Sequence, residues 1–354
     1  MLNILVVGAG AIGCFVGGRL AAAGQNVTLV GRPALMQKIA GQGLILRHPA
    51  RPPQTVYPET VTAIANVSNH YDFILVTVKA PDTPDVIEQL AAANLPTENS
   101  FIVSLQNGIG NEELMADTFG LERVIAGTVT IPISVPEVGT IEVSKDKGGL
   151  GLARMHDAQP VRVLADALTF AGLACPTYPN YQAMKWSKLL LNIVNNASSA
   201  ILDEPPAQIT ANRHLFNMEI EAIREGVRVM NAMNLSAVKL PGYAVDRLAW
   251  LVNAGWLPAA AKRAILRPSM QGGRGSKMPS LHIDLAAGRA TSEVEVLNGA
   301  IARAGQKLGI ATPVNATLTD ILNGLVSGKL DRADYHHKPQ KLLQAIAARR
   351  KHAS

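Results

Sequence analysis

The sequence is poor in several features that mark particular classes of protein. Its 354 residues include only two cysteines, Cys14 and Cys175, too few for a disulfide framework, so a reducing, cytoplasmic location is expected. The histidines show no metal-ligand spacing, and we expect no metal site. Aromatic residues make up 4% and are not interleaved with basic ones, which argues against nucleic-acid binding despite a net charge of +6. No apolar run reaches the roughly 18 residues of a membrane span.

A glycine pattern follows the first apolar run. Gly8, Gly10 and Gly13 have the spacing G-x-G-x-x-G and lie between a strand-like stretch and a helix-like one. In dinucleotide-binding folds the first glycine allows a tight turn, the second lets the backbone approach a pyrophosphate, and the third lets helix and strand pack closely. The phosphates then bind free N–H groups at the helix N-terminus. We therefore expect a dinucleotide to bind here, on Gly8, Ala9, Gly10, Ala11, Ile12 and Gly13.

The carboxylate that binds the ribose of NAD in such folds is missing, because no Asp or Glu precedes Glu59. Arg32 stands instead at the end of the second strand-like run. A guanidinium suits the extra 2′-phosphate of NADP. The predicted cofactor is therefore NADP(H), although an arginine at such a position can also be an ordinary solvated loop residue.

Strand-like and helix-like segments alternate in the first half of the chain, and only helical patterns follow. Expected strands lie at 2–7, 26–30, 43–47, 72–78, 101–105, 123–131, 138–143, 148–153 and 173–178. Expected helices lie at 11–23, 33–41, 82–93, 110–119 and 158–171, then at 181–201, 211–233, 241–255, 258–266, 291–308 and 313–326. The basic end, Arg349 to Lys351, is expected to be a frayed, solvated tail.

This alternation predicts a mainly parallel sheet with helices on both faces. A content of 48% hydrophobic and 17% charged residues indicates a folded chain, and its length favours two domains. We expect an α/β Rossmann-type NADP-binding domain at 1–180. An all-α substrate and catalytic domain should follow at 181–354.

Two polar residues end strand-like runs and should lie near the dinucleotide, since ligands gather at the carboxyl ends of parallel strands. Asn107 has an amide that can both donate and accept, which suits a contact with cofactor or substrate. The pair Asn107-Gly108 is also a common turn. Lys79 can contact the cofactor, or simply end its strand in water.

Lys188, Asn192 and Asn196 recur every four residues in the expected helix 181–201, so they should share one face. The rest of that helix is mostly Leu, Ile, Val and Ala, and buried asparagines need hydrogen-bond partners. We interpret the three as a ligand-facing stripe. Lys188 at its head can protonate an alkoxide as a hydride arrives, or it can pair with a buried carboxylate.

Two residues of the last third are weaker candidates. Ser269 can donate to a substrate carboxylate, and Glu293 can accept from a substrate hydroxyl or orient Lys188. Both residue types are also favoured at helix starts, which is the simpler interpretation of each alone.

Taken in order, these motifs resemble the ketopantoate reductase (2-dehydropantoate 2-reductase) family over nearly the whole chain. The resemblance implies NADPH-dependent reduction of 2-dehydropantoate to (R)-pantoate in pantothenate and coenzyme A biosynthesis. It implies that Lys188 donates the proton and that Glu293 helps to place cofactor and substrate. The implied substrate-binding residues are Asn107, which also meets the cofactor, together with Lys188, Asn192, Asn196 and Ser269.

Two segments depart from the family pattern. Residues 203–206 offer no match for a further substrate-contacting asparagine. The segment between Ser269 and Glu293, which contains the glycine-rich stretch 271–280, is longer than expected. A related NADPH-dependent reductase of a different 2-oxo acid is therefore the alternative. A non-catalytic NADP-binding redox sensor is a second one, which the stripe headed by Lys188 argues against. The partner is expected to be a small 2-oxo acid, and the chain a monomer or homodimer.

Overall fold

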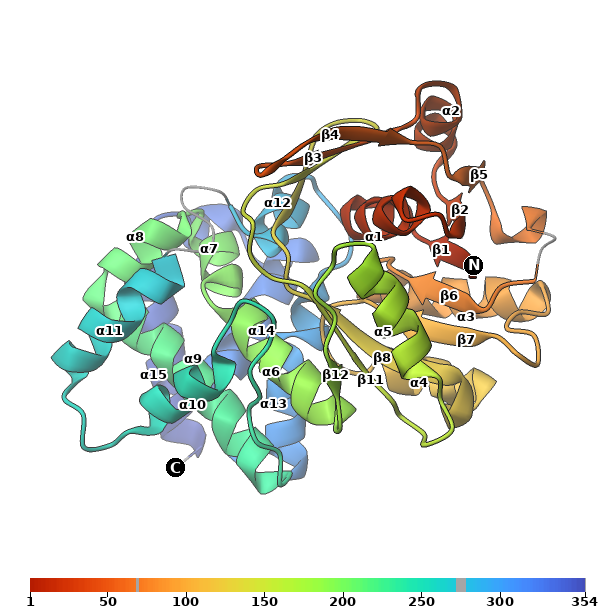
Figure 1. The fold of residues 1–354 in the computed structure, drawn as a ribbon. Helices are drawn as coiled ribbons and strands as arrows, with labels where there is room; N and C mark the ends of the chain where they lie inside the picture. The colour runs from red at the N-terminus through yellow and green to blue at the C-terminus, as the bar shows by residue number, and fades with distance from the viewer. Residues whose placement is uncertain (68–69, 272–277, 354) are drawn as a thin grey trace. The chain divides into compact units, whose positions relative to one another are not determined.

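The structure is a computed structural model that describes residues 1–67, 70–271 and 278–353 (Figure 1). For residues 259, 269, 271, 352 and 353 it describes the backbone alone. The chain divides into two compact units. The first comprises Met1–Lys185 and Leu240–Tyr243, and the second comprises Trp186–Lys239 and Ala244–Ser354.

An eight-stranded sheet forms the centre of the first unit, in the order β12-β11-β8-β7-β6-β1-β2-β5. The strands from β8 to β5 in this order run parallel, and β11 is antiparallel to β8. Their bounds are β1 (Asn3–Val7), β2 (Asn26–Val30), β5 (Glu59–Val61), β6 (Phe73–Val76), β7 (Phe101–Ser104), β8 (Val124–Val129), β11 (Leu150–Ala153) and β12 (Thr177–Tyr178). The expectation of a mainly parallel sheet is confirmed.

Helices cover both faces of this sheet, because its strands are apolar on both sides. Ile4 and Val6 of β1 belong to one core cluster and Leu5 and Val7 to the other, as the alternation of side chains along a strand requires. The first cluster includes residues of α1 and α5, the second residues of α3 and α4. The unit's helices are α1 (Ala11–Ala22), α2 (Pro33–Gln42), α3 (Thr83–Ala92), α4 (Asn111–Phe119) and α5 (Val161–Phe170), with short 3-10 turns η1 (Ile64–Asn66), η2 (Ala80–Asp82) and η3 (Leu121–Arg123).

A second, four-stranded sheet was not expected. Its order is β4-β3-β10-β9, with β3 (Leu44–His48), β4 (Arg51–Val56), β9 (Ile133–Glu137) and β10 (Thr140–Val143). The runs 43–47 and 138–143 are strands as expected, but they pair with each other outside the main sheet. Strand β4 was not predicted, because Pro52 and Pro53 argue against a strand. It forms because it lies at the edge of the sheet, where proline is tolerated.

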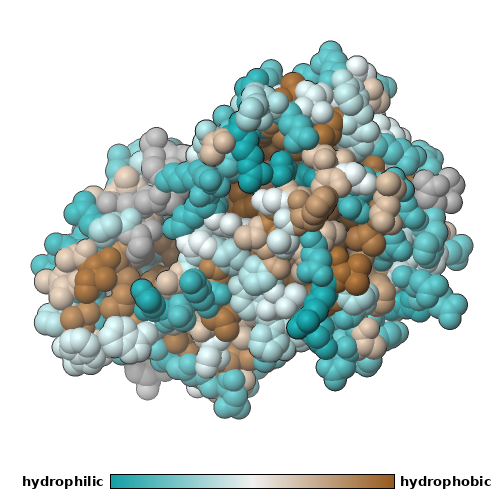
Figure 2. All heavy atoms as spheres, in the orientation of Figure 1, coloured by the Kyte–Doolittle hydropathy of each residue, from teal (hydrophilic) through white to brown (hydrophobic). Residues whose placement is uncertain are grey.

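The second unit is helical, as expected, and within its described residues no β-strand occurs. Helix α6 (Tyr181–Ile193) begins in the first unit and ends in the second. The others are α7 (Asn196–Leu202), α8 (Pro206–Ala211), α9 (Arg213–Ala232), α10 (Val245–Asn253), α11 (Ala259–Gln271), α12 (Ser280–Ala286), α13 (Asn298–Lys307), α14 (Pro313–Val326) and α15 (Pro339–Ala353), with 3-10 turns η4 (Glu293–Val296) and η5 (Arg332–Asp334). Figure 2 shows hydrophobic residues gathered at the surface over α11, where Ile265 is half exposed.

The C-terminal segment corrects the expectation of a frayed tail. It forms α15, which buries Leu342 and Ile346 completely or nearly so. Arg349, one of the basic residues assigned to the tail, pairs with Asp320 of α14. Apolar residues four apart supply enough buried surface to keep this end helical. Among the described residues, none of the helices combines the length and apolar character needed to cross a membrane.

Candidate functional site

The turn between β1 and α1 has the geometry that its glycines predict. Gly8 adopts a φ of +101°, and a Cβ there would come within 2.7 Å of Val78. The N–H groups of Gly8 and Ala9 donate to the carbonyl of Val30 at 3.1 and 2.9 Å, which ties the turn to the end of β2. Helix α1 starts directly afterwards at Ala11. Its first N–H groups therefore point out of the turn, where an anion can accept from them.

Gly13 and Gly10 serve different purposes. A Cβ on Gly13 would overlap the carbonyl oxygen of Gly8 and lie 2.6 Å from Oγ1 of Thr77, whose hydroxyl donates to that carbonyl at 2.7 Å. Gly10 is exposed, and the nearest atom to a Cβ on it would be 4.0 Å away. Gly13 thus permits the helix to pack, whereas Gly10 leaves open the space in front of the α1 N-terminus. Cys14, buried behind it, has its pKa raised by burial to about 12 and is not a reactive thiol.

The candidate residues of the first unit follow adjacent strand ends. Strands β7, β6, β1 and β2 are parallel neighbours in that order. Asn107 follows β7, Lys79 follows β6, the glycine turn follows β1 and Arg32 follows β2. Parallel strands present their carboxyl ends at one edge, so these four points line that edge in the same order. An extended ligand that crosses the edge can meet all of them.

Arg32 is exposed at the N-terminus of α2, whose first turn contains no acidic residue. Strand β5 pairs with β2, and its Glu59 accepts a hydrogen bond from Thr28 Oγ1 at 2.7 Å. Thr28 lies two residues before the end of β2, so the Glu59 carboxylate is hydrogen-bonded within the strand and not at the strand end that Arg32 follows. An anion beside Arg32 would meet a guanidinium and the positive end of a helix dipole together.

The loop after β7 is held by residues whose roles the motifs did not reveal. Gln106 donates from Nε2 to the carbonyl of Val78 at 3.0 Å and to Oγ1 of Thr83 at 2.8 Å. Asn111 donates to the backbone carbonyl of Asn107 at 3.0 Å. These bonds leave the Asn107 side chain half-buried beside the strand ends. The geometry of this loop therefore depends on Gln106, the neighbour of Asn107 in the sequence, and on Asn111.

Lys185 is a second residue that sequence reasoning missed. Its Nζ donates to the carbonyls of Gln106 at 2.7 Å and Gly127 at 3.2 Å, and lies 2.6 Å from Oε1 of Glu112. The alternative interpretation of Lys188 is a lysine that pairs with a buried carboxylate. Lys185, three residues earlier in the same helix, makes such a pair with Glu112. Burial, followed by the charge of Glu112, raises the pKa of neighbouring Glu113. The position of Lys185 between apolar residues of the expected helix was the signal in the sequence that this lysine is buried and needs a partner.

The helix that carries Lys188 is shorter than expected. Helix α6 (Tyr181–Ile193) ends before Asn195, which adopts a left-handed φ of 54°, and α7 starts at Asn196. Lys188, half-buried, and Asn192, buried, share the face of α6 that their spacing predicts. The expectation that Asn196 continues the same helix is wrong, because the break at Asn195 interrupts the helical period.

Asn196 nevertheless stays close to Asn192, since its Nδ2 donates to the Asn192 carbonyl at 3.1 Å. Its Oδ1 accepts from the backbone N–H of Leu281 at 3.2 Å, so both ends of this amide are engaged within the unit. Ser199, further along α7, is fully buried, and its Oγ has no hydrogen-bond partner among the described residues. The polar stripe thus divides into an α6 part and a part tied to α12.

Glu219 of α9 holds the break between α6 and α7. Its carboxylate accepts from the N–H of Asn195 at 2.7 Å and from the hydroxyl of Ser198 at 2.6 Å. This satisfies N-terminal groups of α7 that the left-handed residue exposes. The position of Glu219 among the apolar residues of α9 was the signal in the sequence for this contact, since a buried carboxylate must have hydrogen-bond partners.

The remaining candidates lie elsewhere in the second unit. Glu293 begins η4 and is buried, behind Ser292, whose side chain caps the turn by accepting from Val294 N–H at 3.2 Å. Ser269 belongs to the backbone of α11, but its side chain lies outside the part that the structure describes. Residues 272–277 of the glycine-rich stretch are likewise outside the described residues.

A buried polar network joins α9 to α14. Glu225 accepts from the N–H groups of Val314 and Asn315, each at 2.9 Å, and from Asn315 Nδ2 at 2.7 Å. Burial raises the pKa of Glu225 to about 7 even though these donors oppose the rise. Asn298, whose Nδ2 donates to Asn315 at 2.9 Å, belongs to this network. The network caps α14 and is structural.

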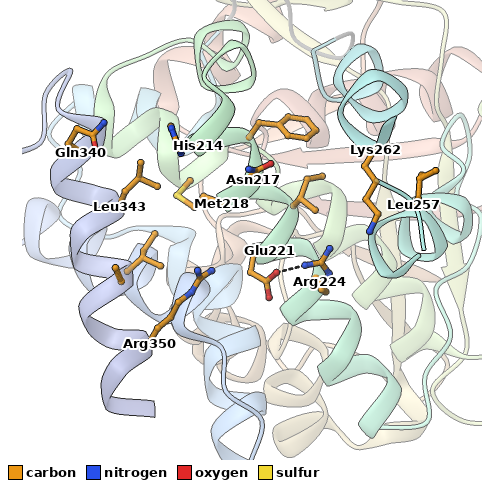
Figure 3. A pocket seen from close by; sticks show the side chains of 14 residues that line it. His214, Asn217, Met218, Glu221, Arg224, Leu257, Lys262, Gln340, Leu343 and Arg350 are labelled. Carbon is orange, nitrogen blue, oxygen red and sulfur yellow. Dashed lines mark hydrogen bonds and ion pairs between the residues drawn. The ribbon is translucent and has the colours of Figure 1, made fainter. Parts of the chain in front are cut away.

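A groove of about 570 Å³ opens on the second unit between α9, α11 and α15 (Figure 3). His214, Glu221, Lys262 and Arg350 are among the polar residues that line it. Among the described residues that line this groove there is no candidate site residue. Its Glu221 pairs with Arg224 at 2.5 Å within α9, so part of its charge is already neutralised.

Comparisons with known proteins agree over most of the chain. A family model described as "Ketopantoate reductase PanE/ApbA" matches residues 4–156, and one described as "Ketopantoate reductase PanE/ApbA C terminal" matches residues 180–326. The 2-dehydropantoate 2-reductase of Archaeoglobus fulgidus is 27% identical over 328 residues, which cover 92% of this chain and 98% of that protein.

Solved structures show the same fold. The PanE/ApbA family ketopantoate reductase from Ralstonia eutropha JMP134 has a TM-score of 0.76 at 26% identity, over 93% of this chain and 99% of that one. A ternary structure of D-mandelate dehydrogenase with NADH and anilino(oxo)acetate has a TM-score of 0.75 at 22% identity, over 92% and 99% of the two chains.

Proposed function

Because the chain belongs to the ketopantoate reductase PanE/ApbA family, whose members are oxidoreductases with a nicotinamide cofactor, we propose that it reduces 2-dehydropantoate to (R)-pantoate with NADPH. The observation that supports this best is the order of candidate residues along the strand ends. Arg32, the glycine turn, Lys79 and Asn107 follow four adjacent strands. This order suits a dinucleotide with its adenosine phosphate at Arg32 and its nicotinamide toward Asn107.

The choice of NADPH rests on charge. Arg32 and the N-terminus of α2 offer positive charge where a 2′-phosphate would lie. Glu59, the first acid of the sequence, is engaged with Thr28 and would not replace it. The pyrophosphate would accept from the N–H groups at the start of α1, over the open side of Gly10. Lys79, which follows β6, would add a cation between the pyrophosphate and Asn107.

The chemistry requires a hydride, a proton and a fixed substrate. NADPH supplies the hydride when it is bound. Lys188 protonates the carbonyl oxygen as it becomes an alkoxide, because an ammonium is the acid available on the α6 stripe. Asn192 and Asn196, with Asn107 and Ser269, would orient the oxo acid, and Glu293 would accept from a substrate hydroxyl and help to place the cofactor.

A different 2-oxo acid is the alternative within the same reaction type. The departure at residues 203–206 motivates it, since the expected asparagine is absent there. D-mandelate dehydrogenase has the same fold, so oxidation of D-mandelate with NAD should also be assayed. A non-catalytic NADP-binding sensor is the second alternative, and it would not need Lys188.

The test is NADPH oxidation by the purified chain with 2-dehydropantoate and a panel of other 2-oxo acids. Turnover should be most efficient, in kcat/KM, with 2-dehydropantoate. Lys188→Ala should lower kcat about 10²–10⁴-fold. The exposed Lys307, replaced by alanine in the same unit, is the matched control and should keep wild-type activity.

Two results would contradict parts of the proposal. A markedly higher kcat/KM for another oxo acid would favour the alternative substrate. Tight NADPH binding without turnover of any oxo acid would favour the sensor. A cytoplasmic location and a monomeric or homodimeric state stay predictions.

A further inference from the structure

Three of the eight histidines of this chain gather around one carboxylate in the second unit. Asp203 follows α7, His282 lies in α12, and His336 and His337 form the turn between η5 and α15. These segments are far apart in the sequence, so no ligand spacing was visible there. None of these residues belongs to the candidate reductase site.

The ligand atoms are close to one another. Nε2 of His336 lies 2.8 Å from Oδ2 of Asp203, and Nε2 of His282 hydrogen-bonds to Oδ1 of the same carboxylate. Nδ1 of His337 lies 3.7 Å from Oε1 of Glu204. One ligand atom each from Asp203, His336 and His337 lie within 4.8 Å of one another. Around a tetrahedral Zn²⁺ such atoms are about 3.3 Å apart, a contraction that side-chain rotation can supply.

Two of these residues have an unusual backbone conformation. Asp203 and His337 have left-handed φ values of 53° and 54°, and they are two of only five non-glycine residues with positive φ in the described part of the chain. The N–H of His337 donates to the carbonyl of Leu202 at 2.9 Å, which ties the histidine turn to the end of α7. Such conformations cost free energy and concentrate at functional positions. Nε2 of His336 is buried, and its geometry toward Asp203 does not make a hydrogen bond.

We propose that Asp203, His336 and His337 bind one transition-metal ion of the Zn²⁺ class. Two imidazoles and a carboxylate match the ligand preference of zinc, whereas Mg²⁺ and Ca²⁺ prefer oxygen alone. Glu204 or a water molecule completes the coordination, and His282 orients the Asp203 carboxylate from outside, as partners of metal ligands do. The ion fastens the turn before α15 to the end of α7 and so stabilises the second unit.

The test uses the full chain without a polyhistidine tag, stripped of metal by a chelator and titrated with ZnCl₂ in a calorimeter. Wild type should bind one ion per chain, and His336→Gln or His337→Gln should weaken binding at least about tenfold. His214→Gln removes an exposed histidine of α9 and should bind as wild type does. Cobalt(II) at the site should show the visible absorption of a tetrahedral complex.

A second measurement covers the case in which a variant folds poorly. Zinc should raise the unfolding temperature of wild type and of His214→Gln but not of the double variant with His336→Gln and His337→Gln, because a ligand stabilises only the state that binds it. Circular dichroism and NADPH binding would establish that this variant is folded. Equal zinc affinity of wild type and the folded double variant would overturn the proposal, as would the absence of zinc binding to wild type. Neither result bears on reductase activity.

Discussion

Nζ of Lys185 lies 2.6 Å from Oε1 of Glu112, and both side chains are excluded from solvent, with 3% and 1% of their surface exposed. The ammonium also donates to the carbonyl of Gln106, in the loop after β7, and to that of Gly127, inside the neighbouring strand β8. A buried charge is tolerated only when it is paired and hydrogen-bonded. This pair therefore links α6 and α4 to the strand edge that carries Asn107.

Breaking this pair from one side should be severe. Lys185→Met leaves the Glu112 carboxylate buried without its cation, so the free energy of unfolding should fall by about 3–5 kcal/mol. Replacing both residues, with Lys185→Met and Glu112→Leu, should recover most of that loss. Urea denaturation measures both, with exposed Lys307→Met as the control. Equal stability of the single and double variants would show that the pair is not coupled.

Two glycines of the fingerprint should respond differently to the same substitution. Gly13→Ala should destabilise the fold, because its Cβ would overlap the Gly8 carbonyl and crowd Thr77. Gly10→Ala should fold normally, since its Cβ meets nothing closer than 4.0 Å, but should weaken NADPH binding by occupying the space that the pyrophosphate needs. Thermal unfolding and cofactor titration separate the two effects. Unchanged NADPH affinity in Gly10→Ala would place the phosphates elsewhere.

Arg32 should decide between the two nicotinamide cofactors. Arg32→Asp removes a charge-assisted contact to the 2′-phosphate, and NADPH affinity should fall about 10–100-fold, while NADH affinity changes little. Arg162→Asp, an exposed substitution on α5 with the same change in charge, is the control. Fluorescence titration with both cofactors measures the difference. Equal losses for NADH and NADPH would remove Arg32 from the phosphate site.

Glu225 should make stability fall as pH rises. Burial raises its pKa from 4.5 to about 7, so between these values the folded chain binds a proton that the unfolded chain has released. The resulting loss between about pH 5 and about pH 8 is at most about 3 kcal/mol. Glu225→Gln should lose less stability over this range than wild type. Denaturant unfolding at both pH values, with exposed Glu88→Gln as the control, measures it. An unchanged pH dependence in Glu225→Gln would contradict the raised pKa.

Local signals predicted the elements that local chemistry controls. The run from β1 through α1 to β2 was predicted from three glycines and two apolar stretches, because the glycine spacing and the two apolar runs lie within the first 30 residues. Helix α14 begins and ends where expected, at Pro313 and Val326, because proline is suited to a first helical turn. The α6 helix was predicted too long, because the sequence around Asn195 does not indicate that Glu219, in the distant helix α9, stabilises the left-handed conformation of Asn195.

By itself the sequence determined the fold class, the dinucleotide fingerprint and the positive charge after the second strand, because periodicity, glycine spacing and charge act over a few residues. Only the tertiary structure decided which strands leave the main sheet, which lysine meets a buried carboxylate, and that three histidines lie around Asp203. Those outcomes join residues far apart in the chain. They depend on which surfaces pack together, and a linear pattern does not contain that information.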